Sequence, residues 1–350
     1  MDTIIEVIDE KDINKDVLKK AGEILKSGGL VAFPTETVYG LGGDAFNPDS
    51  SRKIYEAKGR PSDNPLIVHI ATMDDLPKVA ADIPEKAYAL ADKFWPGPLT
   101  MIFNKVDALP KETTGGLDTV AVRFPVNPIA MELIKQGGGF IAAPSANRSG
   151  RPSPTIAKYV VEDLDGRVEM IIDGGASVIG LESTIVDMTV DPPMILRPGF
   201  ITKEDIEEAL KADIDVDKTI IDGNSTSKPK APGMKYRHYA PKADMTLVSG
   251  SPENVVKYIN DAADKDMKNG LKVGILATDE NASLYRADSI KDLGQRMDEK
   301  AIAHNLFRLL REFDDENINV IYAESFETKG VFQATMNRML KAAGHKEVKL

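Results

Sequence analysis

Short apolar runs alternate with amphipathic stretches along nearly the whole of this 350-residue chain. Runs such as 30–33 and 99–103 are short and continuously apolar, which predicts buried strands. The stretch 14–27 instead repeats apolar residues on one helical face and ends before two glycines, which predicts a helix. Strands that alternate with helices pack as layers of helices on sheets, so the predicted fold class is α/β.

The same pattern places the other elements. Further strands are expected at 66–70, 120–124, 140–143, 170–172, 184–188, 195–196, 245–248, 273–277 and 320–323. Further helices are expected at 49–57, 85–94, 128–136, 156–163, 203–210, 252–267, 298–313 and 331–343. Thr202 is expected to cap the helix at 203–210, with Asp205 in its first turn.

The pattern stops once, between residues 213 and 243. Residues 213–230 are polar, which is typical of a flexible spacer. Residues 232–241 then hold two tyrosines, a histidine, a lysine and an arginine between two prolines. Such a segment is expected to dock onto something flat or anionic, and the alternative is a turn that tucks its tyrosines against a domain surface. The predicted organisation is a first domain at 1–212, a linker at 213–243 and a smaller α/β domain at 244–350.

Composition excludes several classes of protein. A net charge of −11 argues against a protein that grips nucleic acid mainly through phosphates, although it does not exclude a local basic cleft. The absence of cysteine excludes disulfides, thiolate nucleophiles and thiolate metal sites. The acidic N-terminus lacks the features of a signal peptide, and no apolar run approaches the ~20 residues that span a bilayer, so a cytoplasmic protein is expected.

Cationic side chains occupy unusual positions in the first domain. Lys58 and Arg60 flank a glycine shortly before the strand expected at 66–70. Two cations on a rigid turn beside strand ends suit a polyphosphate or a carboxylate, and the alternative is a solvated loop. Arg123 and Arg197 lie in otherwise apolar strands, where a buried arginine needs an anionic partner.

Small hydroxyl groups and glycines lie in the turns beside the first-domain strands. The hydroxyl residues are Thr37, Ser145, Ser153 and Ser183. Segment 40–45 superficially fits a dinucleotide-binding fingerprint, but residues 35–39 separate it from its strand. Only a close approach of backbone to ligand is therefore expected there. His69 lies within an apolar strand, where a core histidine is the default interpretation.

The sequence shows no pattern for covalent or metal catalysis. Segment 175–181 lacks the phosphate-loop lysine, and no His, Asp or Glu cluster has metal-ligand spacing. The four histidines do not support a nucleophilic triad. Cations, hydroxyls and glycines fit chemistry in which the substrates react with each other while the protein positions and neutralises them. Phosphoryl or nucleotidyl transfer is the leading class of that kind.

Several blocks together resemble a known family. Residues 58–60 (Lys-Gly-Arg) and 145–147 (Ser-Ala-Asn) resemble the Lys-x-Arg … Ser-x-Asn signature of the threonylcarbamoyl-AMP synthase family. Residues 34–41 and 60–66 are similar to further blocks of that family, and residues 232–241 resemble the linker of its long, two-domain form. The resemblance covers essentially the whole chain.

The resemblance implies a twisted α/β catalytic domain that is open on one side to a large cationic cavity, followed by a smaller Rossmann-like domain. It implies condensation of L-threonine, bicarbonate (or carbon dioxide) and ATP into L-threonylcarbamoyladenylate with release of pyrophosphate. A separate tRNA threonylcarbamoyltransferase complex would then modify adenosine 37 of tRNAs that read codons beginning with adenine. Mg²⁺ would ride on the triphosphate and not in a protein cage, and tight direct binding of nucleic acid is not expected.

The resemblance also assigns roles to residues. L-threonine would be held by Thr37, His69, Arg123, Ser183 and the backbone of Ala143. ATP would be held by Lys58, Arg60, Asn64, Thr119, Ser145, Ser153, Arg197 and Tyr236. The catalytic set would be Lys58, Arg60, Ser145 and Asn147. A lid over the reacting groups would be formed by Lys235, Tyr236, Arg237 and His238.

Two other functions are alternatives to this interpretation. An RNA-binding module could use the same cationic cavity on double-stranded or transfer RNA, but the acidic balance and the lack of a basic surface interleaved with aromatics weigh against it. A carbamoyl-adenylating enzyme of hydrogenase maturation would need zinc-finger cysteines, and this chain has no cysteine. The second domain shows no catalytic constellation and is expected to anchor the linker and tune its closure.

Overall fold

The computed structural model forms two compact units, each described here by itself. The residues that it describes are 2–217, 220, 231 and 238–350. The first unit comprises 1–149, 153–178 and 182–235, and the second comprises 150–152, 179–181 and 236–350. Within the described residues, no helix is both long and apolar enough to cross a membrane.

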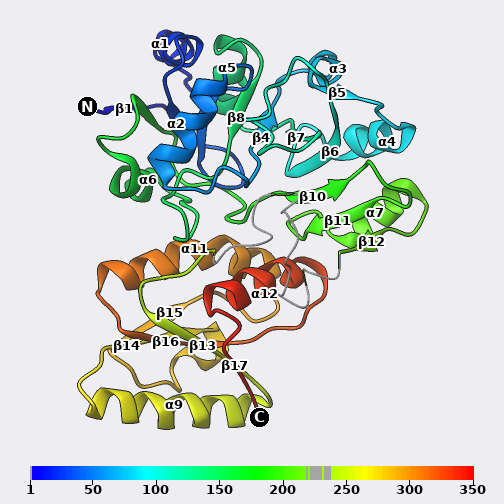
Figure 1. Cartoon of the computed structure of the whole chain (residues 1–350). Coiled ribbons are helices and arrows are strands. Elements are labelled where there is room, and N and C mark those ends of the chain that lie inside the picture. Colours follow the sequence, from blue (N-terminus) through cyan, green and yellow to red (C-terminus); the bar gives the residue numbers. More distant parts are fainter. Residues whose placement is uncertain (1, 218–219, 221–230, 232–237) are drawn as a thin grey trace. The chain divides into compact units, whose positions relative to one another are not determined.

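A mixed sheet of 12 strands forms the centre of the first unit (Figure 1). The strands follow the order β1-β9-β2-β3-β8-β4-β7-β6-β10-β11-β12, and β5 pairs with β6 beside that path. Their bounds are β1 Ile4–Val7, β2 Val31–Phe33, β3 Gly40–Asp44, β4 Ile67–His69, β5 Ala80–Ala81, β6 Leu99–Lys105, β7 Thr119–Arg123, β8 Ile141–Ala143, β9 Met170–Asp173, β10 Thr184–Asp187, β11 Met194–Arg197 and β12 Asp215–Val216. In the centre, β4 and β7 are parallel, while β8 and β6 flank them in the antiparallel sense.

Helices cover both faces of this sheet. On one face, α1 (Lys15–Lys26) and α5 (Pro128–Gln136) pack on residues of β2, β8 and β9. On the other face, the larger core takes residues from α2 (Pro48–Lys58), α3 (Leu76–Val79), α4 (Glu85–Phe94), α6 (Ala157–Leu164) and α7 (Lys203–Leu210). Successive strand residues point to opposite faces, so β2, β8 and β9 each contribute residues to both cores.

A smaller apolar cluster continues the α1/α5 face onto the neighbouring strands. Ala143, in the core under α1 and α5, pairs with Ile67, which pairs with Ala121, which in turn pairs with Ile102. We call this line of four residues the apolar row. Ala231, from the predicted linker, is fully buried in the cluster that contains Ile67, Ala121 and Ile102 of this row.

The second unit is built on a five-stranded sheet with the order β15-β14-β16-β13-β17, in which neighbouring strands pair in parallel. Figure 1 shows α11 and α12 on one side of this sheet and α9 on the other. The bounds are β13 Asp244–Ser249, α9 Pro252–Lys268, β14 Val273–Ala277, α10 Asp279–Ala282, β15 Ser289–Asp292, α11 Glu299–Asp315, β16 Val320–Glu324, α12 Gly330–Ala342 and β17 Glu347–Lys349. A parallel sheet between helices confirms the predicted Rossmann-like architecture.

Two short segments that precede the linker in sequence fold with the second unit. These segments are residues 150–152 and 179–181. Arg311 on α11 is fully buried and donates its Nε to the carbonyl of Pro152 at 3.1 Å. The second unit therefore contains two short segments that are followed in sequence by residues 153 and 182 of the first unit.

The predicted helix start at α7 is confirmed by its capping contacts. The Oγ1 of Thr202 accepts from the backbone N–H of Asp205 at 3.2 Å, and the Asp205 carboxylate accepts from the backbone N–H of Thr202 at 2.9 Å. This reciprocal capping box satisfies two donors that the helix itself leaves without partners.

One prediction about the glycine-rich segment was wrong. Residues 40–45 were expected to be a turn, whereas Gly40–Asp44 is strand β3, between β2 and β8. A Cβ at Gly42 would lie 2.7 Å from Cγ2 of Ile141 and 2.9 Å from Cε1 of Phe33. Glycine is therefore needed here because neighbouring side chains pack against the strand, not because the chain turns.

The strands that the sequence missed lie mainly at sheet edges. β1 and β12 end the first sheet, and β15 and β17 end the second. β1 and β15 alternate half-buried and exposed residues. An edge strand of this kind buries little apolar surface, so it lacks the continuous apolar run by which the inner strands were found.

Replacing Gly22 on α1 with alanine is expected to destabilise the first unit by about 1–3 kcal/mol, as overpacked interiors do. A Cβ at this position would lie 2.5 Å from the backbone carbonyl carbon of Gln136 at the end of α5, so α1 and α5 must separate. Urea unfolding followed by circular dichroism measures the change. The control is Glu23→Ala, an exposed neighbour that should change the free energy of unfolding by less than about 0.5 kcal/mol. Equal stability of Gly22→Ala and the wild type would contradict this account of the helix contact.

Candidate active site

Three polar residues lie side by side across the sheet on the face that carries the apolar row. Arg123 ends β7, His69 pairs with it from β4, and Thr100 pairs with it from β6. Each is two positions along its strand from a member of the apolar row, so all three side chains share that face. All three are buried. We call them the polar row.

Arg123 is held by an ion pair and two hydrogen bonds. Its Nη2 contacts Oε1 of Glu36 at 2.6 Å, its Nη1 donates to Oγ1 of Thr37 at 2.8 Å, and its Nε donates to the carbonyl of Gly97 at 3.4 Å. The side chains of Arg123 and Glu36 are 5% and 7% exposed. This confirms that the buried arginine has an anionic partner. A guanidinium has five N–H groups, so within the described residues one N–H on each terminal nitrogen of Arg123 is left for a ligand.

His69 is neutral at physiological pH. Burial, and next the positive charge of Arg123, lower its pKa to about 3. Its Nδ1 lies 3.0 Å from the carbonyl of Ile67, which can only accept, so a neutral ring carries its proton on Nδ1 and keeps Nε2 as an acceptor. His69 therefore acts as a hydrogen-bonding group and not as a cation.

Thr100 connects the polar row to two further candidate residues. Its hydroxyl lies 2.7 Å from the hydroxyl of Ser183. Arg197 at the end of β11 donates from Nη2 to the same hydroxyl at 3.1 Å and from Nε to the carbonyl of Ser183 at 3.0 Å. The structure thus brings together Ser183, predicted to hold threonine, and Arg197, predicted to hold ATP.

Lys58 organises the segment that carries Ser145 and Asn147. Its ammonium donates to the carbonyl of Ser145 at 2.5 Å and also to the carbonyl of Asn147. The hydroxyl of Ser145 donates to Oδ1 of Asn147 at 2.5 Å. The two halves of the predicted signature therefore form one cluster, in which Lys58 is almost fully buried at the end of α2.

The rest of the predicted cationic turn is ordered by its own backbone. Gly59 takes a left-handed conformation with φ 62° and ends α2, which lets the chain reverse direction. Arg60 then donates from Nε to the carbonyl of Asn64 at 3.2 Å and from Nη2 to the carbonyl of Pro65 at 3.1 Å. These bonds give the turn a defined geometry.

Ser153 is bonded to an acid that sequence reasoning did not single out. Its hydroxyl donates to Oε1 of Glu182 at 2.5 Å, and both residues are buried. Each directly follows one of the two segments that fold with the second unit. The position of Glu182 next to Ser183 was the available signal in the sequence.

Thr119 lies apart from the polar row. It begins β7, four residues before Arg123, which places the two about 13 Å apart on one face of the sheet. Ala121 of the apolar row lies between them. Thr119 lines a separate pocket of about 180 Å³, together with Ile102 and Asp187.

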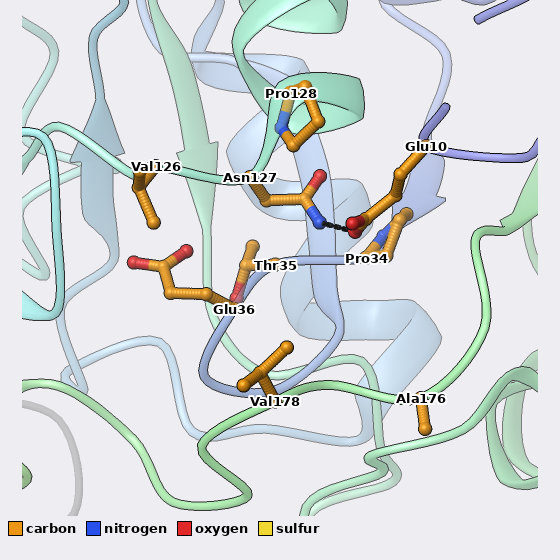
Figure 2. Close-up of a pocket in the computed structure, with 9 residues that line it drawn as sticks. All are labelled: Glu10, Pro34, Thr35, Glu36, Val126, Asn127, Pro128, Ala176 and Val178. Atoms are coloured by element: carbon orange, nitrogen blue, oxygen red, sulfur yellow. Dashed lines mark hydrogen bonds between the residues drawn. The ribbon is translucent and has the colours of Figure 1, made fainter. Parts of the chain in front are cut away.

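A pocket of about 210 Å³ adjoins the Arg123–Glu36 pair (Figure 2). Its walls come from the loops that follow β1, β2, β7 and β9. The lining residues are Glu10, Pro34, Thr35, Glu36, Val126, Asn127, Pro128, Ala176 and Val178. In Figure 2 the Glu36 side chain extends between Val126 and Val178. One side of the Glu36 carboxyl thus meets Arg123, while the residue also borders a space that can hold water.

Three of the four predicted lid residues cannot be compared with the structure. Lys235, Tyr236 and Arg237 lie outside the described residues. His238 is described and is buried within the second unit. The other candidate site residues all belong to the first unit.

Chemically, these clusters offer positive charge, hydroxyl donors and a carboxylate. The buried cations are Lys58, Arg123 and Arg197, and Arg60 is half-buried. Glu36 and Glu182 were not predicted as site residues. Glu36 lies within the resembling block 34–41, and the rule that a buried arginine needs an anion was the signal that could have identified it.

Comparison with known proteins agrees with this geometry. A family model described as "Telomere recombination" matches residues 23–199, and one described as "Threonylcarbamoyl-AMP synthase, C-terminal domain" matches residues 201–344. The threonylcarbamoyl-AMP synthase of Bacillus subtilis is 49% identical over 346 residues, which cover 99% of this chain and 98% of that protein. The corresponding protein of Pyrococcus abyssi is 47% identical over 333 residues, with 95% and 96% covered.

The fold is similar as well. The crystal structure of P. abyssi Sua5 complexed with L-threonine superposes with a TM-score of 0.94 at 46% identity, covering 99% of this chain and all of that one. Family models for both parts of the chain, and relatives that match it nearly from end to end, lead to one conclusion. The chain belongs to the threonylcarbamoyl-AMP synthase family.

Proposed function

We propose that this chain condenses L-threonine, bicarbonate and MgATP into L-threonylcarbamoyladenylate and pyrophosphate. The observation that carries the proposal is Arg123, a buried guanidinium fixed by Glu36 and Thr37, on which the described residues leave one N–H of each terminal nitrogen without a partner. Two parallel N–H groups match the two oxygens of a carboxylate. Relatives named threonylcarbamoyl-AMP synthase, and the structure of one of them with L-threonine, support threonine as the source of that carboxylate.

His69 of the polar row and three neighbouring residues would supply the remaining threonine contacts. A neutral His69 offers Nε2 as an acceptor for the threonine hydroxyl or ammonium. Thr37 and Ser183 bring hydroxyl groups that can donate or accept, and both are buried. The backbone of Ala143 would complete the threonine-binding set. Ala143 lies on β8 and pairs with Ile67 of β4, two residues from His69.

The nucleotide would lie on the cationic clusters. Lys58, Arg60 and Arg197 are each oriented by carbonyl oxygens, and such cations suit a triphosphate. Asn64, Ser145 and Ser153 would add polar contacts, with Thr119 at the far end of β7. Mg²⁺ would enter with ATP as part of the substrate, and Tyr236 would contact the nucleotide.

The reaction needs no nucleophile from the protein. The amine of threonine reacts with bicarbonate to give a carbamate, and a carbamate oxygen then attacks the α-phosphorus of ATP while pyrophosphate leaves. The clusters would hold the reactants in line and neutralise the charge on the phosphates, with Lys58 and Arg60 nearest the transfer and Asn147 supporting the site. The adenylate would then pass to a separate transferase that modifies adenosine 37 of tRNA.

Pyrophosphate release tests this function directly. The purified chain with MgATP, L-threonine and bicarbonate should release pyrophosphate, and omission of either threonine or bicarbonate should remove the signal. Release that does not depend on threonine would contradict the proposal. The alternative, an RNA-binding module, predicts tight tRNA binding whose affinity falls steeply with salt, as phosphate contacts do.

Substitutions at the two ends of β7 should weaken the binding of different substrates. Arg123→Lys keeps a charge beside Glu36 but loses the planar fork, so threonine affinity should fall by at least about tenfold while ATP affinity stays within about threefold. Thr119→Val, at the other end of the strand, should weaken ATP and leave threonine unchanged. Calorimetric titration of each variant with each substrate measures both effects. If Arg123→Lys weakens ATP more than threonine, the assignment of Arg123 is wrong.

The depressed pKa of His69 predicts a specific dependence on pH. In the unfolded chain a histidine takes up a proton near pH 6.5, whereas in the fold burial and Arg123 hold the pKa of His69 at about 3. Folding therefore excludes a proton below pH 6.5, and this group lowers stability progressively as the pH falls from 6.5 toward 3. ¹⁵N NMR should show that the ring of His69 stays neutral at pH 5. The signal should vanish in His69→Gln, and a His69 that titrates near pH 6.5 would refute the assignment.

A further inference from the structure

Glu36 is a buried carboxylate of which only one oxygen is used. Oε1 accepts from Arg123 at 2.6 Å, whereas Oε2 has no hydrogen-bond partner within the described residues. The side chain is 7% exposed, so bulk water does not reach that oxygen freely. Buried polar atoms are normally paired, so an unpaired carboxylate oxygen is an acceptor that a ligand can satisfy.

The position of Glu36 relative to Arg123 defines what that ligand group is. A carboxylate that binds the two remaining N–H groups of Arg123 lies against Nη2, the nitrogen that also contacts Glu36. In an α-amino acid the ammonium is attached to the carbon next to the carboxylate. The ammonium of a bound amino acid is therefore carried to within reach of Glu36, and a cation next to an unpaired carboxylate oxygen forms a charge-assisted hydrogen bond.

We propose that Glu36 binds the ammonium group of threonine and accepts the proton that this group must lose before nitrogen can react. This inference rests on the proposed function. Threonine in its ammonium form and bicarbonate give the carbamate, one water and one proton. The nitrogen lone pair forms the N–C bond, and the C–OH bond of bicarbonate breaks. Oε2 of Glu36 takes the first ammonium proton before the N–C bond forms, and the departing hydroxide takes the second proton and leaves as water.

The pocket in Figure 2 supplies an exit for that proton. Glu36 lines this pocket of about 210 Å³, which has room for several water molecules at about 30 Å³ each. A proton taken up by Glu36 on the side of the substrate can therefore pass through water in the pocket to solvent, which returns the carboxylate to its charged form.

The other titratable groups near Glu36 are poorer candidates for this role. Arg123 stays protonated at all relevant pH values and can only donate. His69 pairs with Arg123 across β4 and β7, but burial and the arginine charge make its ring a weak base. Glu10 also lines the pocket, but its carboxylate is bonded to Asn127. The other lining residues have no titratable side chain. Geometry and chemistry thus single out Glu36 among the described residues.

The test compares Glu36→Gln with Glu10→Gln as the matched control. The amide keeps a carbonyl oxygen for Arg123 but cannot accept a proton, and it presents an NH₂ group in place of Oε2. Threonine affinity at pH 7 should fall at least tenfold, while affinity for 2,3-dihydroxybutanoate, which has a hydroxyl in place of the ammonium, should not fall. Pyrophosphate release should fall at least a hundredfold at pH 7. This deficit should shrink by about tenfold for each unit of pH up to ~9, because the fraction of neutral amine in solution rises by that factor. Glu10→Gln should behave as wild type.

Each other outcome overturns the proposal. Equal losses for threonine and the dihydroxy analogue, or a deficit that does not change with pH, would mean that Glu36 only supports Arg123. Wild-type rates in Glu36→Gln would mean that the carboxylate is not used. If the amide variant does not fold, the test uses wild type and Glu36→Asp. Both should bind threonine at least tenfold more tightly than 2,3-dihydroxybutanoate, and equal affinities would overturn the proposal. Wild type is assayed first, so the absence of threonine-dependent pyrophosphate release counts against the proposed function and not against Glu36 alone.

Discussion

The buried ion pair between Arg123 and Glu36 is the interaction on which the candidate site depends. Removing both charges from water costs several kcal/mol for each ion, and an apolar pair of similar volume would often be as stable. Stability alone therefore does not explain the pair. The geometry of the pair explains it better, because Glu36 and Thr37 fix the plane of the guanidinium. Among the residues that the structure describes, nothing else occupies the second N–H of each terminal nitrogen. The fold keeps an oriented positive charge in place before any substrate arrives.

The sheet makes this arrangement possible because it sets two lines of residues beside each other on one face. The polar row of His69, Arg123 and Thr100 lies next to the apolar row, and the buried Ala231 packs against the apolar side. The five residues of β7 carry Arg123 at one end and Thr119 at the other. A single strand thus spans the distance between the proposed amino-acid subsite and the far end of the proposed nucleotide subsite, so their separation does not rely on a loop.

Sequence patterns predicted most of the fold because they depend on local physics. The helices Glu85–Phe94, Pro128–Gln136 and Lys203–Leu210 begin and end where their periodicity and flanking residues require. Gly42 was misassigned because its role depends on Ile141, a residue that is distant in sequence. Glu36 was missed for a similar reason. Nothing local distinguishes it from a solvated acid, and only the sheet brings it to Arg123. The roles of Gly42 and Glu36 thus depend on contacts between residues that are distant in sequence, which a local pattern does not reveal.

Three cations of the site, Lys58, Arg60 and Arg197, share a feature that bears on catalysis. Lys58 donates to the carbonyls of Ser145 and Asn147, Arg60 to those of Asn64 and Pro65, and Arg197 to that of Ser183. A carbonyl oxygen carries no formal charge, so it orients a cation through its dipole. Charge that is already oriented in a buried site stabilises developing negative charge with little reorganisation during the reaction. A protein that holds positive charge in this way can accelerate transfer between bound substrates while contributing no nucleophile of its own.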